Sequence, residues 1–108
     1  MLSIGAKNIY FHRDPVDMRK GFNGLNKLVE SKFTALILDG GLFLFINKRR
    51  NLMKILYWDN DGFALWYKRL EQGTFKILKD GKTELSRRDF SMLFEGIEPR
   101  KMNKRFFL

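Results

Sequence analysis

The first third of the chain carries one short apolar run followed by a helical repeat of apolar residues. Residues 9–12 are mostly apolar and stop at Asp14 and Pro15, which predicts a strand closed by a turn. From about Asp17 onwards, apolar residues recur every three or four positions, which is the spacing of one helix face. We expect that face to be formed by Met18, Phe22, Leu25 and Val29.

The start of this helix has two interpretations. Asp14 or Asp17 can cap it, because a carboxylate accepts hydrogen bonds from the N–H groups of the first turn. Gly21 and Gly24 fall inside the segment, and each costs about 1 kcal/mol relative to Ala in a helix. Close packing against a sheet would account for these glycines, whereas a kink or a later helix start is the alternative.

The middle of the chain predicts several strands joined by tight turns. Residues 33–38 are apolar and fit either the end of the helix or a strand. Three further runs are rich in strand-forming residues and a fourth is a candidate, in the order 42–46, 52–58, 63–70 and 74–78. The turns are predicted at 39–41, 47–51, 59–62 and 80–81, where Gly, Asn and Asp accept the backbone angles of tight turns.

A second helix follows and completes the pattern. Ser86 and Asp89 form a variant of the capping box, and Gly96 and Pro99 end the helix. Its apolar face consists of Phe90, Leu93, Phe94 and Ile97. We therefore predict an α+β fold for residues 1–108: a single domain with a mainly antiparallel sheet of four to five strands and two helices packed on it.

Length and composition restrict the class of protein. The chain has 108 residues, enough for one domain with its own core. It contains no Cys and a single His, His12, so it offers no disulfide framework and no thiolate or His-rich metal centre. No apolar run reaches the roughly 18 residues of a membrane span, and the first residues lack the apolar core of a signal peptide. We expect a cytoplasmic protein without membrane contact.

The charge balance is strongly basic. Lys and Arg number 21 against 12 Asp and Glu, which gives a net charge of +9. Residues 1–41 carry a net +2 and residues 42–108 a net +7. A positive field on a small domain attracts polyanions, of which nucleic acid is the commonest in a cell. Nucleic-acid contact is therefore favoured over a surface that is charged only for solubility.

No arrangement of residues predicts an enzyme, a cofactor or a metal site. His12 lies in an apolar strand, so a packed or hydrogen-bonded role is favoured over catalysis. The segment 59–62 begins like a calcium loop, but the later Gly and Glu of such a loop are missing, and a hairpin turn explains its residues. The candidate acids lie mostly at turns, so a two-metal nuclease or transposase centre is rejected. Those acids are Asp39, Asp59, Asp61, Glu71, Asp80 and Glu84.

Aromatic and basic side chains share the hairpin formed by the runs 52–58 and 63–70. Tyr57, Trp58, Trp66 and Tyr67 flank its turn, interleaved with Lys54, Lys68 and Arg69. Aromatic faces beside cations can stack bases and neutralise phosphates. Packing under the helices is the alternative, and it is favoured for at least half of these aromatics. Because side chains alternate between faces, one aromatic pair is expected to face outward or toward a partner.

Several longer motifs in this sequence resemble one protein family. They are Asp17-Met18-Arg19-Lys20-Gly21-Phe22 with Gly24-Leu25, Leu42-Phe43-Leu44-Phe45, Lys54-Ile55-Leu56-Tyr57-Trp58-Asp59-Asn60-Asp61-Gly62-Phe63, Leu65-Trp66-Tyr67-Lys68-Arg69-Leu70-Glu71-Gln72-Gly73-Thr74-Phe75 and Leu93-Phe94-Glu95-Gly96-Ile97. They span about residues 9–98 and resemble the small TnpB accessory protein, an Orf-two-like family, of the IS sixty-six insertion sequences. The chain departs from that family at Lys76-Ile77-Leu78, where Trp-Pro is frequent, and its basic tail 99–108 matches no motif.

The resemblance implies a bacterial mobile element with a separate, larger transposase, and a small accessory protein without established catalytic residues. The leading hypothesis is therefore a nucleoid-associated, non-enzymatic accessory for DNA transposition. Its expected partners are duplex DNA at the element ends and the transposase of the same element. The alternative is a protein–protein adaptor without DNA contact, in which the Trp58–Trp66 hairpin docks on the transposase. An enzyme that cleaves nucleic acid is a third class, which requires Mg²⁺-dependent cleavage by the isolated chain.

Eight cations are the predicted DNA contacts, and the four hairpin aromatics are the predicted partner contacts. The cations are Arg19, Lys20, Lys48, Arg49, Arg50, Lys54, Lys68 and Arg69; the aromatics are Tyr57, Trp58, Trp66 and Tyr67. The run 48–50 is distinctive because no acid lies between Asp39 and Asp59 to neutralise it. The alternatives are a soluble hairpin tip for this run, and a solvent-facing helix surface or ion pairs with Asp17 or Glu71 for Arg19 and Lys20.

Overall fold

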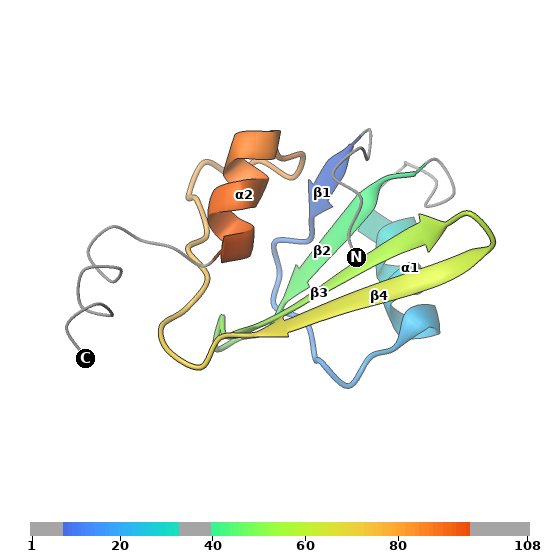
Figure 1. Cartoon of the computed structure of the whole chain (residues 1–108), viewed down its shortest axis with the longest axis horizontal. Helices are drawn as coiled ribbons and strands as arrows, with labels where there is room; N and C mark the ends of the chain where they lie inside the picture. The colour runs from blue at the N-terminus through green and yellow to red at the C-terminus, as the bar shows by residue number, and fades with distance from the viewer. Residues whose placement is uncertain (1–7, 33–39, 96–108) are drawn as a thin grey trace.

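A computed structural model describes residues 8–32 and 40–95, which form one sheet with a helix against each face (Figure 1). The strands are β1 (Ile9–Phe11), β2 (Leu42–Ile46), β3 (Leu52–Asp59) and β4 (Gly62–Arg69); the helices are α1 (Phe22–Lys32) and α2 (Arg87–Glu95). The sheet order is β1-β2-β3-β4, with β1 parallel to β2 and the other two pairings antiparallel. The predicted α+β class is confirmed, with four strands and a mixed sheet.

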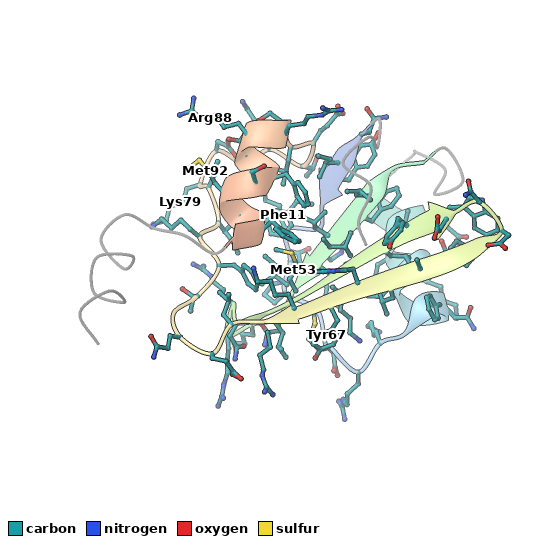
Figure 2. The ribbon with its side chains drawn as sticks, viewed as in Figure 1. Phe11, Met53, Tyr67, Lys79, Arg88 and Met92 are labelled. Atoms are coloured by element: carbon teal, nitrogen blue, oxygen red, sulfur yellow. The ribbon has the colours of Figure 1, made fainter. Side chains whose placement is uncertain are left out.

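The core is organised around β2, in which every residue is buried. Side chains of a strand alternate between faces, so a strand covered on both faces is apolar throughout. On one face, Leu44 packs in a cluster with Phe90 and Leu93 of α2. On the other face, Phe45 packs in a cluster with Leu25 of α1. Figure 2 shows Phe11 and Met53 in the layer between α2 and the sheet, where both belong to the α2-side cluster.

Helix α1 begins at Phe22, so the later start is the correct alternative and a start near Asp17 is wrong. Its first helical hydrogen bond runs from the Leu25 N–H to the Gly21 carbonyl at 3.0 Å. Asp17 forms a turn instead, because its carboxylate accepts the N–H of Arg19 at 2.9 Å. A short polar side chain that bonds to nearby backbone in this way competes with the helix.

The predicted apolar face of α1 is correct in its centre and wrong at its start. Leu25 and Val29 are buried as predicted, but Phe22 is 45% exposed and Met18 lies in the preceding loop. The close packing against the sheet that is the expected reason for Gly24 is not found; an added Cβ there would instead lie 3.3 Å from the side chain of Lys20, in the loop before α1. The segment before α1 therefore packs as a loop, not as a first helical turn.

The predicted strand at 74–78 is wrong within the described chain. After Gly73, whose φ is 75°, this segment crosses the end of the sheet as irregular backbone. Its Phe75 N–H donates to the Arg50 carbonyl at 2.7 Å, and the Phe75 ring is fully buried against the α2-side core. The apolar residues here therefore pack on the core without strand pairing: Phe75 is fully buried, and Ile77 lies partly buried against the same cluster.

The turn and cap signals at 59–62 and 86–89 are confirmed. Asn60 adopts a φ of 56° in the connection from β3 to β4, and Gly62 is the first residue of β4. The Asp89 N–H donates to Ser86 Oγ at 3.1 Å, which is the expected cap of α2. The ambiguous run 33–38, the predicted helix end at Gly96 to Pro99 and the basic tail 99–108 lie outside the described residues.

We expect Phe75→Ala to reduce the free energy of unfolding by about 3–5 kcal/mol, the usual cost of removing a buried Phe ring. Met92→Ala is the control, because Met92 is 45% exposed on α2. Urea denaturation monitored by circular dichroism measures both variants. Equal stabilities for the two variants would contradict the assignment of Phe75 as a core anchor.

Candidate nucleic-acid interface

The connection between β2 and β3 is a rigid loop that presents three cations. Asn47 organises it: its side-chain oxygen accepts the N–H groups of Asn51 and Leu52, both at 3.0 Å. Its side-chain nitrogen donates to the Asn51 side chain at 2.8 Å. Arg50 has a φ of 61°, the left-handed conformation that closes the loop. The basic tip, which we define as Lys48, Arg49 and Arg50, is exposed at all three residues.

The basic tip keeps its charge uncompensated within the described residues, where none of its side chains forms an ion pair. Two of its members also line a groove of about 300 Å³. The groove combines cations with apolar side chains: its lining is Phe11, Arg13, Pro15, Ile46, Asn47, Lys48, Arg50 and Ile77. A surface of this kind can neutralise phosphate with its cations while its apolar part contacts sugar or base.

Arg13 is the member of this groove that sequence reasoning missed. Its guanidinium donates to the carbonyls of Leu78 and Lys82 and forms an ion pair with Asp80 at 2.8 Å. The pKa of the Asp80 carboxyl is lowered below its usual value, mainly by the hydrogen bond from the Lys82 N–H and, to a smaller extent, by the nearby charge of Arg13. These partners lie more than 60 residues away in sequence, so no local pattern indicated them.

Lys54 is a structural residue in this fold, although it is one of the predicted DNA contacts. It is only 7% exposed, and its Nζ donates to the carbonyls of Met18 and Lys20 at 2.6 and 2.9 Å. The ammonium also lies over the Tyr67 ring, 5.1 Å from its centre. Lys54 therefore holds the loop before α1 against β3, and its charge is directed inward.

Lys68 is likewise engaged inside the fold. Its Nζ donates to the Phe94 carbonyl near the end of α2 at 3.0 Å and lies 4.9 Å from the centre of the Phe94 ring. A cation at this position stabilises the partial negative charge of a helix C-terminus. Lys68 therefore links β4 to α2.

The remaining predicted cations are exposed, and two of them form surface ion pairs. Arg19 pairs with the Asp17 carboxylate at 2.7 Å, and this hydrogen-bonded contact lowers the pKa of Asp17 to about 2. Arg69 pairs with Glu71 at 3.1 Å. Lys20 is exposed beside Arg19. Exposed pairs of this kind contribute little free energy, so both arginines can exchange their partner for phosphate.

Of these exposed cations, Arg69 lies at the end of the sheet that carries the basic tip. Arg69 pairs in register with Leu52, the first residue after the loop of the basic tip, and Leu70 N–H bonds to the Asn51 carbonyl. The Lys20 carbonyl is tied to the same region through Lys54. The opposite end of the β3–β4 hairpin carries the acidic turn at 59–61. The sheet therefore has a basic end and an acidic end.

The four hairpin aromatics are divided between the two faces of the sheet and do not form one platform. Tyr57 and Trp66 pack against the α2-side core, where the Trp66 ring lies 4.7 Å from that of Phe94. Trp58 and Tyr67 belong to the opposite face, because they pair in register with Phe63 and Lys54. Of the four, Tyr67 is the most exposed, at 50%.

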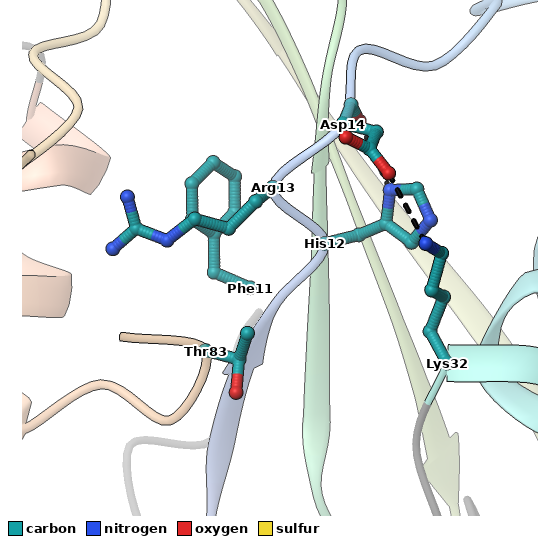
Figure 3. Close-up of a pocket in the computed structure, with 6 residues that line it drawn as sticks. All are labelled: Phe11, His12, Arg13, Asp14, Lys32 and Thr83. Carbon is teal, nitrogen blue, oxygen red and sulfur yellow. Dashed lines mark hydrogen bonds and ion pairs between the residues drawn. The ribbon is translucent and has the colours of Figure 1, made fainter. Parts of the chain in front are cut away.

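His12 lines a second, smaller pocket of about 110 Å³ (Figure 3). Its ring is buried and tilted against Phe45, and Nδ1 lies 2.9 Å from the Asp14 carbonyl. Nε2 is buried without a hydrogen-bond partner in the described residues. The Asp14 carboxylate beside the ring pairs with Lys32 at 3.2 Å. The predicted packed and hydrogen-bonded role of His12 is confirmed.

Neither a metal cluster nor a membrane span is found in the described parts of the chain. Across residues 8–32 and 40–95, no three His, Asp or Glu side chains lie close enough to share a metal ion. The helices within these ranges are too short and too polar to cross a membrane.

Comparison of the sequence with known proteins places the chain in one family. The model of the IS66 Orf2-like proteins matches residues 7–104. An uncharacterized protein of Sinorhizobium fredii, y4jC, is 41% identical over 86 residues, which cover 78% of this chain and 74% of that protein. A second protein of the same organism, y4hO, is 35% identical over 84 residues, or 76% of this chain and 73% of that protein. No solved structure matches.

We expect Lys54→Met to reduce the free energy of unfolding by about 1–3 kcal/mol, because it leaves two carbonyls without their charged donor. The matched control is Lys48→Met, an exposed position where the change is expected to stay within about 0.5 kcal/mol. Chemical denaturation measures both variants. If Lys54→Met is as stable as the control, Lys54 does not hold the loop before α1.

Proposed function

Since the chain belongs to the IS66 Orf2-like family, an insertion-sequence accessory family, we propose that it assists transposition without being an enzyme, by binding duplex DNA through its basic tip. The supporting observation is the position of Lys48, Arg49 and Arg50 on a rigid loop, exposed and without ion pairs among the described residues. A DNA backbone supplies the regularly spaced negative charge that three adjacent cations lack. This contact fixes position on DNA but carries no sequence information by itself.

The proposed interface extends from the basic tip to the other exposed cations among the predicted DNA contacts. Arg69 lies beside the tip, and Arg19 and Lys20 are exposed on the loop that Lys54 holds against β3. Lys54 and Lys68 are excluded because their ammonium groups serve the fold. The groove beside Arg13 adds an apolar surface next to the phosphate-binding cations. We propose the transposase of the same element as the protein partner that receives the bound DNA.

The adaptor function remains a second candidate because the fold uses some of the charge internally. Lys54 and Lys68 are bonded to backbone carbonyls, which leaves fewer cations for DNA than the net charge implies. Fluorescence anisotropy with labelled duplex separates the two functions. Binding at about 50 mM salt supports DNA contact. A slope near −4.5 for log affinity against log salt would correspond to an interface with about five phosphates. If no binding is detected at that salt, the adaptor function is favoured over direct DNA binding.

We expect replacement of Lys48, Arg49 and Arg50 by Ser to leave the fold intact, because each exposed change costs at most about 0.5 kcal/mol. DNA affinity should fall for every sequence, and the dependence of log affinity on log salt should become shallower by about 2–3 units. Anisotropy titrations at several salt concentrations measure both effects.

A variant with Lys27, Arg87 and Arg88 replaced by Ser is the matched control. It removes the same net charge from α1 and the start of α2, which lie away from the connection between β2 and β3 (Figure 1). The proposal requires that the dependence of log affinity on log salt become shallower in the tip variant than in the control. Equal losses would mean that net charge alone binds DNA, and the tip would lose its assigned role.

A further inference from the structure

The outer edge of β4 is the open edge of this sheet. β4 is eight residues long and ends the strand order, and no strand of the described chain pairs with its outer side (Figure 1). The opposite edge, β1, has three residues and is covered by the segment 83–85, which bonds to Ile9 and Phe11. An open edge presents unpaired N–H and C=O groups that can template another strand.

The register of the β3–β4 ladder determines which backbone groups are available at this edge. The Leu70 N–H donates to the Asn51 carbonyl at 2.8 Å, so this pair is of the hydrogen-bonded type. Such pairs recur at every second residue, which directs the backbone of Lys68, Trp66 and Ala64 toward β3. The groups of the alternate residues therefore point outward. These residues are Phe63, Leu65, Tyr67 and Arg69.

The side chains along the edge are unusual for an exposed strand. Natural edge strands are commonly protected by charge. Here Phe63 and Tyr67 are 40% and 50% exposed on the α1 side, with the half-buried Leu65 between them. Charge is confined to the two ends, where Asp61 precedes the strand and Arg69 ends it.

We propose that β4 pairs antiparallel with β4 of a second copy of this chain, with Leu65 opposite the partner's Leu65. Read at every second residue from the turn residue Asp61 along β4, the order is Asp61, Phe63, Leu65, Tyr67, Arg69. This order is self-complementary under a two-fold axis: Phe63 meets the partner's Tyr67, and Asp61 meets the partner's Arg69. Each contact occurs twice, as an isologous interface requires.

The charges at the ends of β4 favour a second copy of this chain as the partner, in the register with Leu65 opposite the partner's Leu65. Aromatic pairs and opposite charges directly across a ladder stabilise strand pairing, whereas like charges destabilise it. A shift by two residues in either direction would separate both Asp–Arg pairs. The ion pair of Arg69 with Glu71 is exposed, so it contributes little and does not hold Arg69 away from the partner's Asp61. The result is one continuous sheet across two chains, formed by strand addition.

This dimer goes beyond the proposed function and is tested without DNA. Sedimentation of the full chain over a wide concentration range should show a reversible monomer–dimer equilibrium. Phe63→Lys should weaken dimerisation by about tenfold or more, because it removes the aromatic contact with the partner's Tyr67 and places a charged, hydrated group on the paired edge. Met92→Lys is the matched control, since Met92 is equally exposed but lies on α2 (Figure 2). A wild-type chain that stays monomeric, or equal effects of the two variants, would overturn the proposal.

A pair of charge variants tests the register itself. Asp61→Arg alone sets Arg against Arg at both ends, and Arg69→Asp alone sets Asp against Asp, so each variant should dimerise about tenfold or more weakly. Mixed in equal amounts, they restore both opposite-charge pairs and should form a heterodimer. Circular dichroism checks that each variant is folded. A mixture that remains monomeric at concentrations where the wild type dimerises contradicts this register.

Discussion

The fold depends on covering β2 on both faces. Its five residues are all buried, so an uncovered face would expose either three or two large apolar side chains to water. α1 and the loop before it cover Phe43 and Phe45, while α2 and Phe75 cover the alternate residues. Because two separate segments must be held against the sheet, polar groups are used as anchors. Lys54 holds the loop before α1, and Lys68 and Arg13 hold the segments around α2.

The use of cations as anchors decides which charges remain for a partner. The anchoring cations point inward or along the surface to backbone carbonyls, so they are poor candidates for phosphate contacts. Within residues 8–32 and 40–95, cations on loops and strand ends stay exposed, and the basic tip contributes three in a row. Function on a connecting loop that a rigid scaffold positions is a common arrangement. The outer edge of β4, in contrast, is where we propose the contact with a second copy of the chain.

Sequence pattern predicted the strands and turns well because each has a local signal. The apolar run 42–46, the Asn60 turn and the Ser86 cap all depend on residues close in the chain. The start of α1 was harder, because Asp17 bonds its own neighbours and the decisive contact from Lys54 spans more than 30 residues. The candidate strand at 74–78 is irregular backbone, because its apolar residues Phe75 and Ile77 pack on the core without pairing to a neighbouring strand.

For the candidate site, sequence identified the exposed tip but not the inward roles of two predicted cations. Lys54 lies in an apolar strand, and its acceptors are carbonyls of a loop whose position depends on tertiary packing. Arg13 was missed for the same reason, since its partners Leu78 and Asp80 lie more than 60 residues away in sequence. Side-chain alternation did predict that the hairpin aromatics divide between faces. The side-chain anchors could not be predicted without the three-dimensional arrangement of the strands.

The most direct test of this account is an NMR titration of the ¹⁵N-labelled chain with short duplex DNA at low salt. The central claim is that the exposed basic tip binds DNA while the inward cations serve the fold. We predict that amide shifts concentrate at residues 47–51 and their neighbours at the same end of the sheet. The amides of the acidic turn at 59–61 and the side-chain signal of Lys54 should stay unchanged. Shifts centred on Phe63, Leu65 and Tyr67 of β4, or no shifts at all, would contradict the account.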